Sequence, residues 1–469
     1  MNNKVLKNLL KVLGIYFVVA FLFSFIGGDG LRFKYVVSEM PTQTGMLEEL
    51  TSDKIVKQKF VAQEETLDTI DLLVATYGRE NVGTIELTIE DINGNIVAQQ
   101  RDVVAAFEDN SIYKWVINPG IENVKGKQYE LIIKTTCEEG TAPTIYYSSN
   151  IENSFEVDGK ERSGAICFDY VGRKFFVFGK FYWYFVLLGA VFILSYALWN
   201  LVKKKQGKNT FGLTLLAVWS RYEFLIRQLI SRDFKTKYKR SVLGYLWSFL
   251  NPLLTMMVQY IVFSRIFRSG IENFPVYLLS GIIMFNFFTD AVGQGLTAIV
   301  DNATLITKVY VPKYIYPVTK VASCSINLFI SVIPLLIVAI LTGTKIKLAI
   351  LLLPFPLLCM LIFCIGMALI LCTTMVFFRD TQYLWGIVSM VWMYATPIFY
   401  PENIVPDQFR FVQVLNPVYH FIRFIRTILI NGVSPEPKAY LLCLLSSAIV
   451  LIFGMTVFKR FQDKFVLYI

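Results

Sequence analysis

Long apolar runs dominate this chain of 469 residues, and most of them are long enough to cross a membrane. One run covers about residues 9–26 and a second covers about residues 181–202. Six more follow at about residues 242–267, 275–299, 315–342, 347–376, 382–399 and 439–458. A membrane-spanning helix needs about 20 predominantly apolar residues. The pattern therefore predicts a polytopic α-helical membrane protein with about eight spans, two near the N-terminus and six in a later core.

Between about residues 31 and 173 the pattern changes from continuous apolar runs to alternation. Residues 83–97 alternate apolar and polar positions around Asn93-Gly94, which is typical of two strands joined by a tight turn. Segments 113–117 and 129–134 are predicted as further strands, bounded by the turn residues 118–120 and 125–127. Several short strands at this spacing predict a β-sandwich inserted between the first two spans.

Residues 222–240 combine an apolar stripe with a basic face. Leu225, Ile226 and Leu229 recur at helical spacing, and Lys and Arg occupy much of the remaining surface. A helix of this kind lies in the membrane interface rather than crossing the bilayer. The segment 409–430 is also too interrupted by proline and charged residues for a span, so it predicts short re-entrant or interfacial helices.

Composition and charge support a membrane protein and suggest its topology. Of all residues, 55% are hydrophobic and 17% charged, against about 25% charged in soluble domains. Residues 29–172 contain 25 Asp and Glu against 13 Lys and Arg, whereas the remainder contains 10 acidic and 32 basic residues. Lys and Arg near span ends favour the cytoplasm, and three lysines at 203–205 follow the second span. We expect both termini inside, the acidic β-sandwich outside, and no nucleic-acid partner.

The expected organisation has five parts. They are an N-terminal transmembrane helix at 1–28, which lacks a small-residue cleavage site and stays uncleaved, an extracytoplasmic β-sandwich domain at 29–178, a second transmembrane helix with a basic cytoplasmic linker at 179–208, a cytoplasmic amphipathic interface helix at 209–240, and a six-span domain at 241–469.

The chain lacks the residues of common catalytic and metal sites. Its one histidine is His420, whereas zinc sites and Ser–His or Cys–His nucleophile systems need His with partners. No G-x-x-x-x-G-K-[ST] motif is present, so the chain has no P-loop for ATP. Transporters that are driven by an ion gradient usually have charged residues inside their membrane spans. In the later spans of this chain, charged residues are limited chiefly to Asp290 and the Arg379-Asp380 pair. We expect no catalytic residue, metal or cofactor in this chain. If the chain moves a substrate uphill, the energy comes from a partner or an ion gradient, and the scarcity of charge in the spans favours a partner ATPase that binds ATP and magnesium.

Two cysteines of the acidic segment leave two interpretations open. Cys137 and Cys167 pair if they are close and the segment is extracytoplasmic. Otherwise they are two separate buried thiols. The other five cysteines lie in apolar spans, where Cys acts as a small hydrophobe.

Four stretches of the later part of the chain occur in a fixed order. They are residues 231–254, 302–317 (N-A-T-L-I-T-K-V-Y-V-P-K-Y-I-Y-P), 377–381 (F-F-R-D-T), and 396–401 (T-P-I-F-Y-P) continued by 416–419 (N-P-V-Y) and Arg426. Together they resemble the permease subunits of ABC exporters for O-antigen, teichoic acid and related polysaccharides. The resemblance implies that the six-span domain is an exporter-type permease core in the bacterial cytoplasmic membrane. It also implies a lipid-linked polysaccharide as cargo and, as partners, a P-loop ATPase subunit in two copies and a second copy of this chain.

The resemblance also implies an interface with the ATPase. The helix that ends near Arg240 corresponds to the interface helix of such permeases, and residues 302–313 correspond to their coupling helix. The candidate interface residues are Arg232, Asp233, Lys237, Tyr238, Arg240, Asn302, Leu305, Lys308, Pro312, Lys313, Arg379 and Asp380. For Lys308 and Lys313 the alternative role is simple anchoring at the cytoplasmic membrane face.

A channel for glycans is expected to contain aromatic rings, because the C–H faces of sugars pack on ring faces. The candidates for channel lining are Tyr260, Phe285, Phe287, Phe288, Trp385, Trp392, Tyr394 and Tyr400. The alternative is that these rings form interfacial belts or face lipid. Residues 396–426 resemble the outer re-entrant helices that shape the channel exit, with Pro397, Pro401, Asn416, Pro417, His420 and Arg426 as candidate residues.

The resemblance supplies no role for residues 1–208, because permeases of this kind mostly begin near the interface helix. One hypothesis is that the β-sandwich binds the glycan through Tyr113, Trp115 and Tyr146. The alternatives are that these side chains belong to the core, and that the domain contacts a cell-wall partner or acts as a spacer or lid.

Two other functions are alternatives to export. A membrane glycosyltransferase acting on a lipid-linked sugar needs an outer carboxylate, and Glu402 or Asp407 is available. A transmembrane sensor needs a cytoplasmic output domain, and the chain after Arg240 has no soluble segment of sufficient length.

Overall fold

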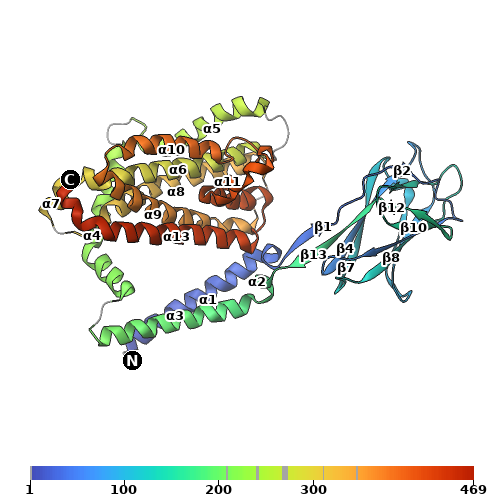
Figure 1. The fold of residues 1–469 in the computed structure, drawn as a ribbon, viewed down its shortest axis with the longest axis horizontal. Coiled ribbons are helices and arrows are strands. Elements are labelled where there is room, and N and C mark those ends of the chain that lie inside the picture. Colours follow the sequence, from blue (N-terminus) through green and yellow to red (C-terminus); the bar gives the residue numbers. More distant parts are fainter. Residues whose placement is uncertain are drawn as a thin grey trace. The chain divides into compact units, whose positions relative to one another are not determined.

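The computed structural model describes residues 3–207, 210–238, 242–266, 273–309, 311–344 and 347–468. The chain forms two compact units (Figure 1). Met1–Leu31 and Phe181–Ile469 form a helical unit, called here the membrane unit, and Arg32–Lys180 form a β-unit. Of the candidate interface residues, Arg240 and the side chain of Tyr238 lie outside the described part.

The membrane unit consists of helices of very different lengths. Its α-helices are α1 (Asn3–Arg32), α3 (Tyr182–Lys205), α4 (Phe211–Tyr238), α5 (Leu246–Ile266), α6 (Phe274–Asp301), α7 (Ala303–Lys308), α8 (Ile315–Leu341), α9 (Pro354–Phe377), α10 (Thr381–Ala395), α11 (Arg410–Leu415), α12 (Pro417–Arg426), α13 (Pro437–Phe461) and α14 (Phe465–Tyr468).

Seven helical segments among the described residues are long and apolar enough to cross a membrane. They are Leu9–Arg32, Tyr182–Lys203, Leu246–Phe263, Phe274–Asp301, Ile315–Leu341, Leu348–Phe377 and Pro437–Tyr468. The prediction of a polytopic helical membrane protein is confirmed. The amphipathic α4 and the short helices α11 and α12 are not among these segments, as the interrupted sequence of each indicated.

The eighth predicted span is shorter than expected. Residues 382–399 form α10, which has 15 residues and ends at Ala395. At a rise of 1.5 Å per residue this helix is about 22 Å long, against about 30 Å for the hydrocarbon core of a bilayer. It ends there because Pro397 disfavours helical backbone at the residue before it, and Thr396 is extended.

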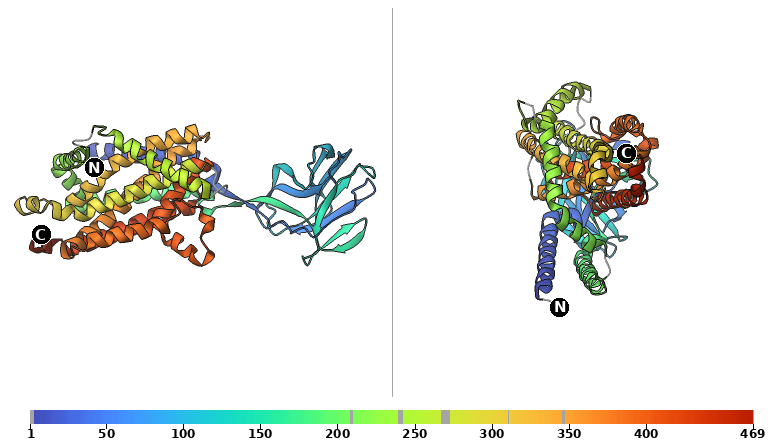
Figure 2. Two further views of the ribbon diagram at one scale, coloured as in Figure 1. Left: turned by 90° about the horizontal axis from the view of Figure 1, so that it is seen from above. Right: turned by 90° about the vertical axis from the view of Figure 1, so that its left-hand side faces the viewer.

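The long helices of the membrane unit run side by side around a common core (Figure 2). Helix α6 lies at the centre, where it packs against α8 and α9, and α9 packs in turn against α13. Side chains from these four helices and from α12 make up one buried cluster. Most of α6 is buried, and its exposed positions, Asn286, Asp290 and Asp301, are polar.

Two glycines bring α9 and α13 into close contact. A Cβ added to Gly366 would lie 2.7 Å from the backbone of Val450 and Leu451. A Cβ added to Gly454 would lie 2.4 Å from the carbonyl oxygen of Gly366. Small residues allow this backbone approach between helices in lipid, where packing rather than the hydrophobic effect holds helices together.

Helices α1 and α3 form a pair within the membrane unit (Figure 1). The Tyr182 hydroxyl donates to the carbonyl of Ala20 at 2.6 Å, and the Tyr16 hydroxyl donates to the carbonyl of Val186 at 2.9 Å. The ring of Phe23 in α1 lies 5.2 Å from the ring of Tyr440 at the start of α13. These contacts attach the first two spans to the six-helix core.

The β-unit is a two-layer sandwich. Its strands are β1 (Phe33–Val37), β2 (Gly45–Met46), β3 (Ile55–Val61), β4 (Thr66–Ala75), β5 (Thr84–Asp91), β6 (Ile96–Val103), β7 (Ser111–Glu122), β8 (Gln128–Thr135), β9 (Thr144–Ser148), β10 (Ser154–Val157), β11 (Lys160–Ser163), β12 (Ala165–Ile166) and β13 (Phe168–Phe175), followed by the short helix α2 (Val177–Lys180). One sheet has the order β11-β10-β3-β8-β5-β6. The other has the order β1-β13-β4-β9-β12, with β7 on β4 and β2 on β9. The predicted extra β-domain is confirmed.

The predicted hairpin is present. Strands β5 and β6 pair antiparallel across residues 92–95, and the Asp91 carboxylate accepts the backbone N–H groups of Asn93 and Asn95 at 2.8 and 2.9 Å. Gly94 has φ +79°, a conformation that favours glycine. The turn residues 118–120, in contrast, do not end a strand. They form a bulge within β7, where the register with β4 shifts.

Strands β1 and β13 form an antiparallel ribbon at the point where the chain enters and leaves the β-unit. Phe33 pairs with Phe175 at one end of the ribbon and Val37 with Val171 at the other. Cys137 and Cys167 are buried as two separate free thiols, which corresponds to the second of the two interpretations.

Candidate functional site

One end of the membrane unit, called here the α7 end, is held together by an ionic network between α4, α6 and α8. The carboxylate of Asp233 lies 2.9 Å from the Arg232 guanidinium and 3.4 Å from the Lys320 ammonium, and it is largely buried. Arg232 also donates to the side-chain oxygen of Asn302 at 3.3 Å, and the Asn302 amide donates to the carbonyl of Ala298 at 2.8 Å. The network fixes the interface helix α4 to the segment that leads into α7.

An apolar cluster lies beside this network. Leu229 of α4 and Ile306 of α7 are buried in it together with residues of α6, α8, α9, α13 and α14. In the same short helix α7, by contrast, Thr304, Thr307 and Lys308 are exposed. Helix α7 is therefore fixed to the unit by one side and presents a polar and basic side outward.

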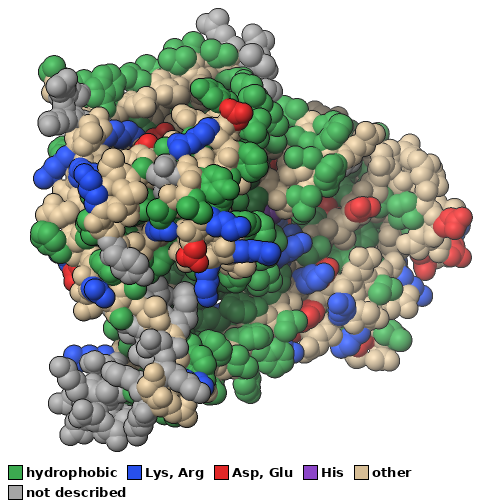
Figure 3. All heavy atoms as spheres, turned by 60° about the vertical axis from the view of Figure 1, so that its left-hand side comes forward, with side chains coloured by type: hydrophobic (Ala, Val, Ile, Leu, Met, Phe, Trp, Pro, Cys, Tyr) green, Lys and Arg blue, Asp and Glu red, His purple; other side chains and the backbone are tan. Residues whose placement is uncertain are grey.

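The other candidate interface residues lie at the same end. Lys313 donates to the carbonyl of Gln462 at 2.7 Å, and Arg379 donates to the carbonyl of Tyr468 at 3.4 Å. Leu305 and Pro312 are partly buried, while Asp380 is exposed. Many Lys and Arg side chains and few Asp and Glu are visible on this face in Figure 3.

Lys237, at the C-terminal end of α4, contacts a cavity in the membrane unit. Its ammonium lies 3.0 Å from the carboxylate of Asp290 in α6. The two side chains line a cavity of about 440 Å³ between α4, α5, α6 and α8. Most other polar groups of the lining are neutral or aromatic, among them Trp247, Ser248, Asn251, Asn286, Asn327 and Ser331.

At the opposite end of α6, Arg426 organises the backbone that follows α10. This side chain is only 5% exposed. Its guanidinium donates to the carbonyl of Pro397 at 2.8 Å, of Tyr277 at 3.1 Å and of Ile398 at 3.3 Å. The Tyr277 hydroxyl donates to the carbonyls of Pro397 at 3.2 Å and Tyr400 at 2.8 Å. Non-helical backbone at membrane depth requires such partners, and these two residues supply them.

Asn416 joins α10 to α12. Its side-chain oxygen accepts the indole N–H of Trp392 at 2.8 Å and the backbone N–H of Val418 at 3.0 Å, which caps α12. Its amide donates to the Thr396 hydroxyl at 2.8 Å. Pro417 occupies the first helical turn of α12, a position that proline favours. The predicted re-entrant region thus consists of short helices tied together by side-chain hydrogen bonds.

Two other positions of this region are less central. The His420 ring nitrogen forms a 2.7 Å hydrogen bond with the carbonyl of Val414, a local contact between α11 and α12. Pro401 precedes a short 3-10 turn that contains Glu402. The Glu402 carboxylate accepts the Tyr419 hydroxyl at 2.8 Å. The side chain of Asp407, the other carboxylate weighed for a glycosyltransferase, lies outside the described part.

The aromatic residues predicted to line a channel have different environments. The structure contradicts this role for Phe285 and Phe288, which are core residues with 4% and 0% of their surface exposed. Trp385 is also buried, with its ring 5.6 Å from that of Phe288. The reason is that the rings of Phe285 and Phe288 lie on the side of α6 that packs into the bundle, whereas the polar Asn286 and Asp290 lie on its exposed side.

The remaining channel candidates are more accessible. Phe287 is buried but lines the cavity beside Asp290. Tyr260 of α5 and Tyr394 of α10 are exposed, and both helices present broad apolar surfaces. Trp392 and Tyr400 are partly buried, and the Tyr400 hydroxyl donates to the carbonyl of Tyr394 at 2.7 Å.

The glycan-binding residues predicted in the β-unit do not form one site. Trp115 is 2% exposed and belongs to the core, so the structure contradicts its predicted role. The hydroxyl of Tyr113 donates to Asp102, and that of Tyr146 donates to Asn110. None of the three lines the cavity that the sandwich contains.

Sequence reasoning missed several partners of the residues that it selected. Tyr277 and Lys320 contact predicted residues from 149 and 87 positions away in the chain. Neither residue carried a signal of its own in the sequence. A pattern along one helix gives no information on which residue of a distant helix faces it.

The later half of the chain is similar in sequence to known proteins. Residues 225–430 match the family model described as ABC-2 type transporter. The chain is 29% identical over 246 residues to the O-antigen export system permease protein RfbA of Myxococcus xanthus, covering 52% of this chain and 95% of that protein. It is 22% identical over 244 residues to the capsule polysaccharide export inner-membrane protein CtrC of Neisseria meningitidis, covering 51% and 91%. It is 23% identical over 245 residues to the polysialic acid transport protein KpsM of Escherichia coli, covering 51% and 93%. Nearly the whole of each relative therefore corresponds to about half of this chain.

Proposed function

We propose that this chain, which carries an ABC-2 type transporter domain at residues 225–430, is the permease subunit of an exporter that moves a lipid-linked polysaccharide across the cytoplasmic membrane. The cargo class follows from the relatives, which are named as export proteins for O-antigen and capsular polysaccharide. None of the relatives reported above is named as a glycosyltransferase. The paired state of Glu402 also weighs against it as a free catalytic carboxylate.

The arrangement of α7 supports energy coupling to a separate ATPase. Helix α7 is held on its inner side by Ile306 and by the Arg232–Asn302 contact, while Thr307 and Lys308 face outward. Because α7 is fixed to the unit in this way, a movement of a bound ATPase would displace α6 and α8 together with α7. The ATPase subunit supplies the P-loop, ATP and magnesium, and this chain contributes the docking surface.

The distribution of charge supports a topology. The α7 end carries the basic residues Lys308, Lys459 and Arg460 together with the C-terminus, and basic residues near span ends favour the cytoplasm. With α1 and α3 as two spans, the acidic β-unit then lies outside the cell. Residues 396–426 lie on that same side, where the cargo leaves.

A second copy of this chain completes the pathway. Helices α5 and α10 present rows of exposed apolar residues, including Met257, Ile261, Leu384 and Val391. Such rows face either lipid or a partner. In a two-fold assembly, with two ATPase subunits, Tyr260 and Tyr394 of both copies line the space between them.

Depletion of the chain in cells tests the proposed function. We expect loss of one surface polysaccharide, together with accumulation of its lipid-linked form inside the cell. A variant of the partner ATPase without the P-loop lysine should give the same result, because hydrolysis drives this step. An intact cell surface after depletion would show that the chain does not export a surface polymer.

A further inference from the structure

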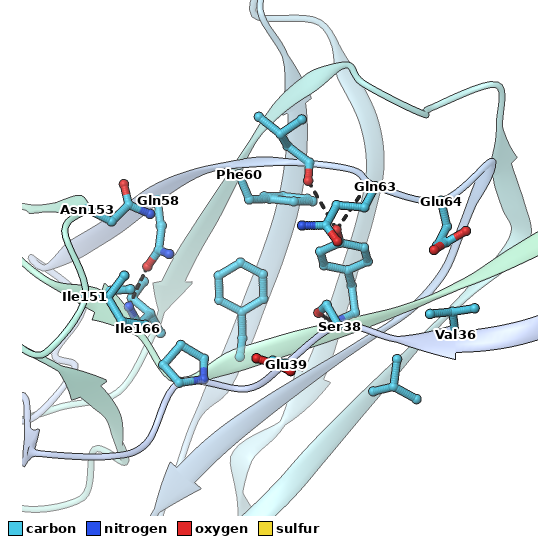
Figure 4. Close-up of a pocket in the computed structure, with 16 residues that line it drawn as sticks. Val36, Ser38, Glu39, Gln58, Phe60, Gln63, Glu64, Ile151, Asn153 and Ile166 are labelled. Atoms are coloured by element: carbon cyan, nitrogen blue, oxygen red, sulfur yellow. Dashed lines mark hydrogen bonds between the residues drawn. The ribbon is translucent and has the colours of Figure 1, made fainter. Parts of the chain in front are cut away.

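The β-sandwich contains a cavity that lies outside the residues matched by the family model. It measures about 630 Å³ and opens between β3 of one sheet and β1, β12 and β13 of the other (Figure 4). The rest of its wall comes from residues 38, 39, 41, 63, 64, 151 and 153. Ligand sites in proteins have volumes of about 300–1,000 Å³, so the cavity is large enough for a small-molecule-sized group.

One wall of the cavity is aromatic. The ring of Phe60 on β3 lies 5.5 Å from that of Phe168 and 5.6 Å from that of Tyr170 on β13. Phe168 and Tyr170 alternate along β13 and so point to the same side of the strand. Both are buried, whereas Phe60 is partly exposed. Phe60 therefore presents a ring to the cavity, and the two buried rings hold it in place.

Hydrogen bonds fix the polar groups around this ring. The Tyr170 hydroxyl accepts the backbone N–H of Gln63 at 3.0 Å and donates to the carbonyl of Val61 at 3.1 Å. The Gln58 side chain is 5% exposed, and its oxygen accepts the backbone N–H of Ile166. Its amide N–H₂ group is therefore what Gln58 offers to the cavity (Figure 4).

Glu64 provides an acceptor at the other side of the cavity. Its Oε2 atom is buried and has no hydrogen-bond partner among the described residues. Buried polar atoms in proteins are nearly always hydrogen-bonded, so this oxygen marks a position for a donor from a bound molecule. Glu39 contributes a second carboxylate across from Phe60 (Figure 4). All lining residues are described, and none of them is Lys or Arg.

We propose that this cavity binds an uncharged sugar residue of the exported glycan. A pyranose has apolar C–H faces that pack on the Phe60 ring. Its hydroxyls donate to Glu64 and Glu39 and accept from the Gln58 amide. That a sugar binds is inferred from the ring, carboxylates and amide that line the cavity. That this sugar belongs to the exported glycan rests on the proposed function.

The charge of the site excludes anionic ligands with similar shape. A polyanionic glycan carries phosphate or carboxylate groups. In this cavity they would be repelled by the carboxylates of Glu39 and Glu64, and no Lys or Arg lines the cavity to pair with them. A basic peptide would pair with the carboxylates, and its backbone carbonyls can accept from the Gln58 amide, so the binding test includes such a peptide. The sugar uses the ring, the donors and the acceptors together. The glycan segment that reaches this domain is therefore neutral.

Binding by the full-length chain in lipid nanodiscs tests the proposal. The probe is the surface polysaccharide of the source cells, released from its lipid by mild acid and separated by anion exchange into neutral and anionic fractions. We expect the neutral fraction to bind and the anionic fraction to bind at least about tenfold more weakly. Phe60→Ala and Glu64→Gln should each weaken the binding about tenfold, the usual effect of losing a hydrogen bond to a charged group or an equivalent contact.

Phe107→Ala is the matched control. Phe107 is also partly buried against the sandwich core, with its ring 4.8 Å from Tyr113, but it does not line the cavity. We expect this variant to bind the neutral fraction like the wild type. Because Glu64 is not part of the core, Glu64→Gln keeps the test decisive even if Phe60→Ala does not fold.

Three outcomes would overturn the proposal: binding of the anionic fraction alone, binding of a hexalysine peptide but of neither fraction, or equal effects of Phe60→Ala and Phe107→Ala with no effect of Glu64→Gln. Depletion of the chain, as described above, tests export separately. A cell that loses its surface polymer, while the neutral fraction fails to bind, would contradict only the sugar site. An intact surface would contradict only the exporter.

Discussion

The guanidinium carbon of Arg426 lies 3.3 Å from the centroid of the Tyr277 ring, although the two residues are 149 positions apart in the chain. The arginine also donates to the carbonyl of Tyr277, and both side chains donate to the carbonyl of Pro397. The buried positive charge of Arg426 is stabilised by the ring and by hydrogen bonds to three carbonyls, so it does not need a carboxylate partner. The pair therefore fixes α6, α12 and the backbone after α10 to one another.

Loss of Arg426 should destabilise the membrane unit strongly. Arg426→Met leaves the buried carbonyls of Tyr277, Pro397 and Ile398 with fewer donors, so we expect a loss of about 3 kcal/mol or more. Thermal unfolding of the purified chain in detergent measures it. Arg423→Met, an exposed position on the same helix, should change stability by no more than about 0.5 kcal/mol. Equal effects of the two variants would show that Arg426 is not structural.

The close contact of α9 and α13 should be sensitive to a single methyl group. Gly366→Ala and Gly454→Ala each place a Cβ within 2.7 Å of the opposite backbone. We expect each to cost about 1–3 kcal/mol, because the helices must move apart. Gly386→Ala in α10 meets no atom within 4 Å and should leave the unfolding temperature unchanged or raise it slightly. Tolerance of both close-contact variants would mean that the helices lie farther apart.

Helix α7 should become protected when the ATPase binds. All seven native cysteines are buried, so an introduced exposed thiol can be labelled selectively. Thr307→Cys should react rapidly with a maleimide, and addition of the partner ATPase should slow the reaction severalfold. The neighbouring Ile306 is buried, so Ile306→Cys should react slowly with or without the partner. Unchanged labelling of the Thr307 variant in a functional complex would contradict docking at α7.

The stability of the β-sandwich should depend on pH through Asp169. Burial and the facing carboxylate of Asp71 raise the pKa of Asp169 to about 6. Because an unfolded Asp titrates near pH 3.9, the folded state binds the proton more tightly. The sandwich is then most stable below about pH 4 with respect to this group, loses stability as the pH rises to about 6, and changes little above that value.

Asp169→Asn should remove this dependence and stabilise the sandwich at pH 7.5 by about 1–3 kcal/mol. Hydrogen exchange of the amides in β4 and β13 of the full-length chain measures the change. Glu161→Gln removes an exposed carboxylate on β11 and should leave the profile unaltered. If the stability of the Asp169→Asn variant still fell between about pH 4 and pH 6, another group would be responsible for the pH dependence.

Much of the fold was predictable because membrane helices and hairpins are defined by local pattern. About 20 consecutive residues are enough to predict the secondary structure in three cases: the long apolar runs, the alternation around Asn93-Gly94 and the apolar stripe of α4. The shortened α10 is an instructive exception. Its apolar character continues to Tyr400, but Pro397 ends the helix, and donors from Arg426 and Tyr277 satisfy the carbonyls of Pro397, Ile398 and Tyr400 that follow.

The sites were less predictable, because they depend on which side of a helix or strand faces inward. In α6 the polar residues Asn286 and Asp290 mark the exposed side at helical spacing, but the buried Phe288 and the cavity-lining Phe287 are neighbours of the same type, so residue type alone did not separate them. In the sandwich, Trp115 was a reasonable ligand-binding residue by type and proved to be core. Phe60 gave no comparable signal, because its cavity depends on two sheets meeting.

The β1–β13 ribbon has a consequence for how the cell can process this protein. The β-unit enters and leaves through paired strands: β1 follows the span α1 directly, and β13 leads through the short helix α2 into the span α3. One proteolytic cut anywhere between residues 33 and 180 therefore leaves both fragments embedded in the bilayer, still joined by the sandwich sheets. Shedding of the domain requires two cuts, one on each strand of the ribbon, so a nicked molecule keeps its outer domain.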